Sequence, residues 1–233
     1  EIWACVQSPQ TARQQVAGAL KIPVENVTIN VTLLGGGFGR KAKPDFAVEA
    51  ALLAKQAGRP VKVVWRREDD IKHGYYHSVS GQRLSATLDD NNHVTGWYHE
   101  TVFPPISSTF NPAANKPSDG ELDLGHLDTP FDVPNLQLER GEANAHVRIG
   151  WMRSVANVYH AFAKESFVAE LAHQTQVDHK DFLLQLIGKD RHVDFAASNA
   201  KYGNYGDDLN DYPVDTARLK NVINKVTAMA DTL

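Results

Sequence analysis

The spacing of apolar residues changes repeatedly along residues 1–78, and these changes predict alternating strands and helices. Stretches rich in β-branched residues, mostly alternating apolar with polar positions, predict strands at residues 1–6, 27–34 and 61–65, the last largely buried on both faces. Apolar residues three or four positions apart predict helices at residues 9–20 and 44–57. Ser8 and Pro9 suit the start of the first helix, and Gly58 suits the end of the second.

The pattern changes after residue 79. Two alternating stretches, 79–88 and 94–102, flank the turn-forming residues Asp89-Asp90-Asn91-Asn92, which predicts an antiparallel hairpin. Residues 104–130 and 198–213 have little periodicity and predict loops, and residues 136–148 predict another strand. Helical spacing then predicts three further helices, at residues 157–174, 182–187 and 216–229.

Together these elements predict an α+β fold with mixed sheets and flanking helices. We expect three regions: residues 1–78 with a glycine-rich segment, residues 79–150 with the hairpin and long loop, and the helical residues 151–233. The chain begins without Met inside a predicted strand and stops in or just after a helical pattern. We therefore expect both ends to be cuts in a longer chain.

Composition excludes several classes of protein. The 233 residues are 42% hydrophobic and 22% charged, as in soluble globular proteins, and the net charge of −4 argues against a nucleic-acid-binding surface. The single cysteine, Cys5, permits neither an internal disulfide nor a CxxC metal site. His73 and His77 have a spacing that suits a metal only on a helix, and their segment is predicted to be extended, so no metal ligands are assigned.

The segment Leu34-Gly35-Gly36-Gly37-Phe38-Gly39-Arg40-Lys41 is the sharpest chemical feature. So many glycines cost chain entropy, and they are typical of a main chain that approaches a ligand closely or turns with positive φ. The segment matches neither the Walker phosphate loop nor the dinucleotide fingerprint, which lacks its third glycine here at Arg40. A tight turn without any ligand remains an alternative.

Four blocks of sequence carry a resemblance to a known family. Besides the glycine-rich segment, they are Trp-Ala-Cys-Val-Gln-Ser-Pro-Gln at 3–10, Pro-Val-Lys-Val-Val-Trp-Arg-Arg-Glu-Asp-Asp at 60–70, and the Trp-Met-Arg-Ser-Val…Ala-Phe-Ala-Lys-Glu-Ser-Phe block within 151–172. Over roughly residues 1–190 the chain resembles the molybdenum-cofactor-binding large subunits of the xanthine dehydrogenase and aldehyde oxidase family. It is most similar to the branch of isoquinoline 1-oxidoreductase beta subunits and membrane-linked aldehyde dehydrogenases.

The resemblance implies roles for particular residues. Gln7 matches a glutamine whose amide donates a hydrogen bond to an oxo ligand of molybdenum. The loop matches main chain that lies against the metal and its dithiolene, and Arg153 matches an arginine after which the backbone approaches the cofactor again. The cofactor-binding residues so implied are Gln7, Gly36, Gly37, Phe38, Gly39, Arg40 and Arg153.

Departures from the family pattern limit the expected activity. Ala42 and Val155 stand where purine-hydroxylating members carry a substrate-binding glutamate and a stacking aromatic residue, so xanthine is not the expected substrate. The family's G-V-G-E motif, with its catalytic glutamate, does not occur, and Glu165 and Glu170 are interpreted as exposed helix residues. We therefore assign no catalytic residue here, and expect the general base beyond Leu233.

The resemblance implies a bacterial oxidoreductase subunit that hydroxylates an N-heterocycle or oxidises an aldehyde, with water as the oxygen source. Its cofactor would be molybdenum–pterin, with the cytosine dinucleotide form as one option, and this piece alone would be inactive and without cofactor. Implied partners are the rest of its own large subunit, an iron–sulfur small subunit, a cytochrome electron acceptor and a small-molecule substrate. A periplasmic or membrane-associated location is favoured slightly over the cytoplasm.

Two other functions remain open at this point. The chain could be a non-catalytic scaffold or assembly domain whose glycine loop packs on a partner. It could also be a phosphate- or nucleotide-binding module that uses the segment Gly35–Lys41.

Overall fold

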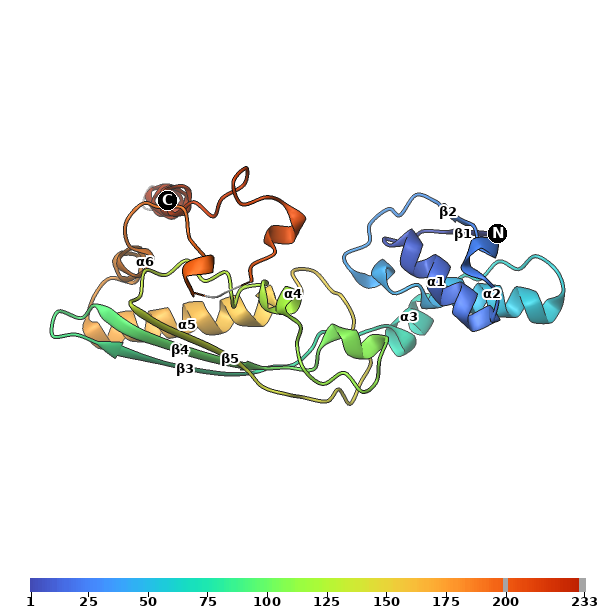
Figure 1. Cartoon of the computed structure of the whole chain (residues 1–233), viewed down its shortest axis with the longest axis horizontal. Helices are drawn as coiled ribbons and strands as arrows, with labels where there is room; N and C mark the ends of the chain where they lie inside the picture. Colours follow the sequence, from blue (N-terminus) through green and yellow to red (C-terminus); the bar gives the residue numbers. More distant parts are fainter. Residues whose placement is uncertain (199–200, 231–233) are drawn as a thin grey trace. The chain divides into compact units, whose positions relative to one another are not determined.

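The computed structural model describes residues 1–198 and 201–230, which form two compact units (Figure 1). Unit 1 comprises Glu1–Ser78, Ser108–Asn111 and Ala145–Val155, and unit 2 comprises Val79–Ser107, Pro112–Asn144 and the chain from Ala156 onward. Part of the predicted loop 198–213, residues 199–200, lies outside the described residues. No helix in the described ranges is both long and apolar enough to cross a membrane.

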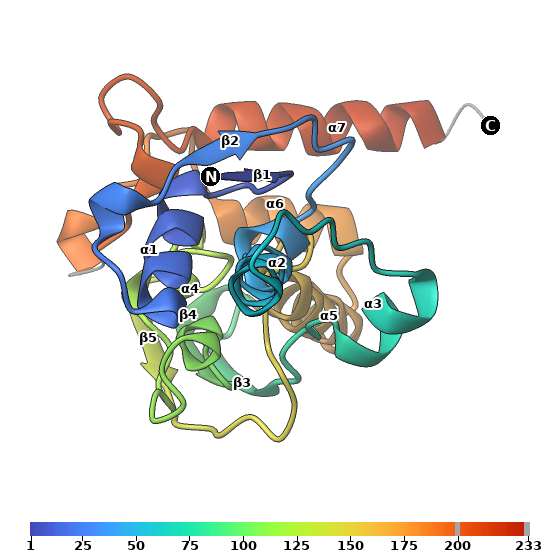
Figure 2. The same ribbon diagram turned by 90° about the vertical axis from the view of Figure 1, so that its right-hand side faces the viewer.

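Unit 1 begins with a short parallel pair of strands, β1 (Ile2–Ala4) and β2 (Ile29–Val31), in the register Ile2↔Ile29 (Figure 2). The connection between them contains α1 (Pro9–Leu20) and a 3-10 turn, η1 (Val24–Asn26). The chain continues through η2 (Arg40–Ala42) into α2 (Asp45–Ala57) and α3 (Arg67–His73). Helices α1 and α2 lie side by side.

The apolar stripe of α1 forms the core of unit 1. Ala12, Val16 and Ala17 are buried, and they pack towards the strand pair and towards α2. The helix ends where Lys21 takes a left-handed conformation (φ 57°), and this residue's N–H group closes on the last carbonyls of the helix. The two helices predicted at 9–20 and 44–57 are thereby confirmed.

Two predictions for unit 1 are wrong. The strand predicted at 61–65 has no ladder partner among the described residues, and Val64 is 72% exposed rather than buried. A β-branched run becomes a strand only where a neighbouring strand accepts its hydrogen bonds, and β1 and β2 pair with each other instead. The segment that ends at His73, predicted to be extended, forms α3 because the carboxylate of Asp69 accepts the Arg66 N–H at 3.0 Å and caps the first turn.

Unit 2 is built on a three-stranded mixed sheet, in the order β3-β4-β5. β3 (Gly81–Leu88) and β4 (Val94–Val102) form the predicted antiparallel hairpin, and β5 (Asn135–Arg140) pairs parallel to β4. The hairpin turn is stabilised by Asp89, whose carboxylate accepts N–H groups from the turn. β5 stops at Arg140, short of the predicted 148, and the combination of sheets and helices confirms the α+β class.

Four helices belong to unit 2: α4 (Asp119–Leu122), α5 (Asn157–Thr175), α6 (His179–Ile187) and α7 (Thr216–Ala230). The 3-10 turns are η3 (Ile106–Thr109), which runs across the boundary into unit 1, η4 (Ala196–Ser198) and η5 (Asn204–Gly206). Helix α5 runs along one face of the sheet (Figure 1). Trp97 from β4 packs there with Val168 and Leu171 from α5. Phe162, which the helical spacing had grouped with this stripe, is instead 75% exposed.

A buried polar cluster interrupts this apolar core. His99 and Thr101 follow Trp97 on the same face of β4, because side chains two positions apart share a face of a strand. His160 and Lys164 occupy the buried face of α5, and His126 comes from the loop before β5. All five side chains are at most 7% exposed. We define them as the histidine cluster.

Hydrogen bonds connect the members of the histidine cluster. His160 Nδ1 lies 2.8 Å from the carbonyl of Leu124, so this nitrogen carries the proton, and Nε2 lies 2.9 Å from Thr101 Oγ1. The Nδ1 atoms of His99 and His126 face each other at 3.2 Å, so only one of them can be protonated. The cluster is therefore satisfied when its histidines are neutral.

Burial disfavours the charged form of each histidine. It lowers the pKa of His160 from the ordinary value of 6.5 to about 4. Burial also lowers the pKa of His99 and His126, and the positive charges of neighbouring histidines and of Lys164 lower them further. In the unfolded chain these histidines titrate near 6.5, so below that pH the unfolded state binds protons that the folded state does not.

We therefore predict that the free energy of unfolding of unit 2 falls as the pH falls from 7 to 4. Each histidine contributes up to about 1.4 kcal/mol per pH unit in this range. His160→Gln should flatten the dependence, even where it lowers stability at neutral pH. Urea unfolding at several pH values measures the effect. His173→Gln, at an exposed position on the same helix, is the control and should keep the full dependence; equal slopes for both variants would contradict the prediction.

Candidate functional site

The glycine-rich segment forms a turn that only glycine-rich sequence can adopt. Gly35, Gly36 and Gly39 have φ values of 64°, 143° and 88°, in the region that residues with a Cβ rarely enter. Phe38 also has positive φ, at 49°, and its side chain is 62% exposed. We refer to residues 35–39 as the glycine loop.

Close packing requires glycine at two positions of this loop. A Cβ atom on Gly37 would overlap with the side chain of Gln7, and one on Gly39 would lie 2.7 Å from the main chain of Trp151. The loop is therefore in contact with Gln7 on one side and with Trp151 on another. Glycine is needed at these positions for space, in addition to the backbone conformation.

Gln7 binds the loop through its amide oxygen. Oε1 accepts the N–H groups of Gly39 at 3.0 Å and Lys41 at 3.2 Å, and the Gln7 N–H donates to the Lys41 carbonyl at 3.0 Å. Because the oxygen is fixed by two donors, the orientation of the side-chain amide is defined. Its NH₂ group has no partner within the described part of the chain, and it remains available as an uncharged donor.

The loop offers further uncharged donors. The main-chain N–H groups of residues 35–38 have no hydrogen-bond partner among the residues that the structure describes. Successive free N–H groups in a turn of this kind bind anionic or strongly dipolar groups. The glycine loop and Gln7 therefore present a set of donors that carries no formal charge.

Arg153 supports the exposed end of the loop. Its N–H donates to the Phe38 carbonyl at 3.1 Å, and its guanidinium lies 4.7 Å from the centroid of the Phe38 ring. These two contacts hold Phe38 in a backbone conformation that is unfavourable for an aromatic residue. The structure thus brings Gln7, Gly36, Gly37, Phe38, Gly39 and Arg153 together at one loop.

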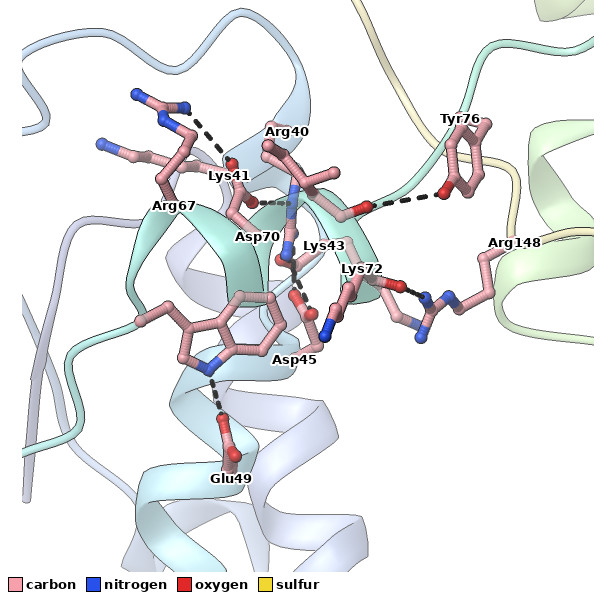
Figure 3. A network of polar contacts seen from close by, with 12 residues as sticks. Arg40, Lys41, Lys43, Asp45, Glu49, Arg67, Asp70, Lys72, Tyr76 and Arg148 are labelled. Carbon is pink, nitrogen blue, oxygen red and sulfur yellow. Dashed lines mark hydrogen bonds and ion pairs between the residues drawn. The ribbon is translucent and has the colours of Figure 1, made fainter.

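Arg40 is directed away from the loop. Its guanidinium forms a bidentate pair with Asp45 at 2.8 and 2.9 Å and lies 3.7 Å from Asp70 (Figure 3). The rings of Trp65 and Tyr75 flank it at 5.6 and 5.1 Å. These contacts tie the end of the loop to α2 and α3, so the geometry gives Arg40 a positioning role.

Lys41 is also turned back towards the protein, since its ammonium donates to the Leu34 carbonyl. With Arg40 held by Asp45, neither cation beside the loop is free to neutralise a polyphosphate. The arrangement therefore gives little support to the nucleotide-binding alternative, which needs such a cation at the phosphates.

Acidic and metal-ligating residues do not complete the site. Glu165 and Glu170 are exposed on α5 in unit 2, as the sequence predicted. Across residues 1–198 and 201–230, no three His, Cys, Asp or Glu side chains are grouped so that they could hold a metal ion. The geometry can therefore position a polar cofactor and its ligands through hydrogen bonds, with no carboxylate assigned as a base.

Two supporting residues, Trp151 and Asp45, were not among the sequence-based site residues. Trp151 begins the fourth block of the resemblance, but its role as the wall behind Gly39 depends on a contact 112 positions along the chain. Asp45 follows Arg40 by five positions at the start of α2, a place where an acidic residue is favoured by the helix dipole. That preference was the available signal.

Comparisons with known proteins agree with this geometry. The model of the molybdopterin cofactor-binding domain family matches residues 1–185. The isoquinoline 1-oxidoreductase subunit beta of Brevundimonas diminuta is 29% identical over 79% of this chain and 24% of its own length. The membrane-bound aldehyde dehydrogenase of Gluconacetobacter polyoxogenes is 30% identical over 74% of this chain and 23% of its own length.

Solved structures support the fold. The aldehyde oxidoreductase of Desulfovibrio gigas matches 78% of this chain and 20% of its own with a TM-score of 0.67 at 15% identity. The quinoline 2-oxidoreductase of Pseudomonas putida 86 matches 78% of this chain and 23% of its own with a TM-score of 0.62 at 21% identity. The chain spans about a quarter of the length of the relatives it matches. With the family model covering residues 1–185, the chain belongs to the molybdopterin cofactor-binding domain family.

Proposed function

We propose that this chain supplies the glycine-loop side of a molybdenum–pterin site, within a larger subunit that hydroxylates N-heterocycles or oxidises aldehydes. The observation that carries the proposal is the geometry of Gln7. Its Oε1 atom is bound by two loop N–H groups, which leaves its NH₂ group and the N–H groups of residues 35–38 as neutral donors on one loop. The names of the similar proteins support the two classes of substrate.

The residues present fit such a cofactor. A bound molybdenum–pterin group would supply the two-electron redox chemistry, with water as the source of oxygen. Gln7 would donate to an oxygen ligand without adding charge, while Gly36, Gly37 and Gly39 let the main chain come close. Phe38 would provide an apolar surface that Arg153 holds in place, and Arg40 would fix the loop from behind.

Further parts of the proposal extend beyond this chain. We propose that the general base is a glutamate in another part of the larger subunit, and that the cytosine dinucleotide form of the cofactor binds only when that part is present. An iron–sulfur subunit and a cytochrome would receive the electrons. The printed names of two relatives as subunits of larger enzymes support a multi-subunit assembly. The nucleotide released on denaturation, identified by its mass, tests the form of the cofactor.

Gly37→Ala should remove the cofactor. The added Cβ atom would overlap with Gln7 and displace it, so we expect molybdenum content in the purified larger subunit to fall at least tenfold, measured by mass spectrometry of the metal. Gly18→Ala, on α1, is the matched control because its Cβ would meet no atom within 4 Å. Equal molybdenum content in the two variants would refute the proposed site.

Substitutions of Gln7 separate its structural and chemical roles. Gln7→Ala removes both acceptor contacts and should lower the free energy of unfolding of unit 1 by about 1–3 kcal/mol. Gln7→Glu keeps an oxygen for the loop N–H groups but replaces the neutral donor by a negative charge.

We therefore expect Gln7→Glu to retain most of the stability and to lose at least a hundredfold in kcat for an aromatic aldehyde. Chemical unfolding and steady-state kinetics measure the two effects. If Gln7→Glu were as active as the unsubstituted enzyme, the amide would have no role as a donor to the cofactor.

A further inference from the structure

Lys43 is a half-buried cation with an incomplete set of partners. Its ammonium group has three donors, and the structure shows one acceptor, the Thr109 carbonyl at 2.8 Å. No carboxylate in the described part of the chain lies within 4.0 Å of Lys43 Nζ. The charge of Asp45 acts on Lys43 from further away, but both oxygens of that carboxylate are held by Arg40.

Aromatic rings surround this cation. Lys43 Nζ lies 4.1 Å from the centroid of Phe110 and 5.9 Å from that of Tyr75. Phe110 in turn contacts Trp151, with ring centroids 5.7 Å apart. Since the main chain of Trp151 lies against Gly39, a continuous row of contacts leads from the Lys43 ammonium to the glycine loop.

The charge around Tyr75 is unbalanced. Arg40 is neutralised by Asp45, but Lys43 has no acidic partner, and the ion pairs of the described residues include none for Arg148 (Figure 3). Arg148 donates to the Lys72 carbonyl and lies 5.9 Å from the Tyr75 ring. Burial lowers the pKa of Lys43, which means that its charged form has lost hydration that no carboxylate replaces.

We propose that Lys43 is a specificity-determining residue that binds the carboxylate of an aromatic substrate, so that the site beside the glycine loop accepts anionic ring compounds. A carboxylate would complete the hydrogen bonding of the ammonium, and the faces of Phe110 and Trp151 would contact the ring. The inference rests on the proposed function, because it concerns the substrates of that same site.

Binding of simple probes tests the proposal without cofactor. The 233-residue chain is titrated with benzoate, benzamide and acetate at constant ionic strength, following the indole N–H resonance of Trp151, assigned with Trp151→Phe. We expect benzoate to bind at least tenfold more tightly than benzamide, which lacks the charge, and than acetate, which lacks the ring. Equal affinities for benzoate and benzamide, or the absence of a saturable shift, would overturn the proposal.

Variants of Lys43 identify the residue responsible. Lys43→Met should weaken benzoate binding at least tenfold and abolish the preference over benzamide, whereas Lys43→Arg should retain the preference. Lys55→Met is the matched control, because Lys55 also donates to a backbone carbonyl, that of Leu20 at 3.1 Å, at the far end of α2. Loss of the preference in Lys55→Met as well, or its persistence in Lys43→Met, would reject Lys43 as the binding residue.

Kinetics of the loaded enzyme give a second readout. Lys43→Met should raise KM for 4-carboxybenzaldehyde at least tenfold and leave KM for benzaldehyde unchanged; equal effects on both substrates would count against the inference. Molybdenum content should not depend on Lys43, whereas the proposed function requires that it depend on Gly37. Failure of the benzoate preference with normal molybdenum binding would therefore reject only this inference, and loss of the Gly37 effect would reject the proposed function.

Discussion

The site depends on one acceptor atom, the amide oxygen of Gln7. By accepting the N–H groups of Gly39 and Lys41, it joins the segment after β1 to the segment after β2. Gly37 must then be glycine, because Gln7 occupies the space beside it. With this end of the loop fixed, η2 begins at Arg40, whose guanidinium meets Asp45 at the start of α2. Lys43 follows three positions later and reaches Thr109 and Phe110. The positions of the polar groups around the loop thus follow from one pair of hydrogen bonds.

Sequence alone was sufficient for the elements whose signals are local. Helical spacing predicted α1, α2, α5 and α7, and the Asp-Asp-Asn-Asn turn predicted the β3–β4 hairpin. The glycine loop was recognised from composition, and the resemblance indicated Gln7 and Arg153 beside it. Predictions failed where the outcome depends on distant partners. Residues 61–65 have strand-like composition but no neighbouring strand, and Arg40 was assigned to the cofactor although Asp45, Trp65 and Tyr75 surround its guanidinium.

The histidine cluster illustrates a different limit of sequence reasoning. His99 and Thr101 lie on the apolar face of β4, and His160 and Lys164 on the apolar face of α5, so the pattern itself contained the signal that polar groups enter the core. What the pattern could not show is that these groups satisfy one another. A buried polar network of this kind stabilises one arrangement of strand and helix, since any shift of register would leave donors and acceptors unpaired. Its dependence on neutral histidines is the cost of that specificity.

Unit 1 is assembled from three separate stretches of the chain. The glycine loop emerges early during synthesis, but Phe110, Trp151 and Arg153, which contact the loop or its flanking residues, are translated much later, after both strands of the hairpin and β5. The loop therefore cannot acquire its final surroundings until more than half of the chain has left the ribosome. Cofactor loading at this corner would accordingly be a post-translational step, coupled to a folding reaction in which the last pieces to arrive close the pocket wall around a loop made first.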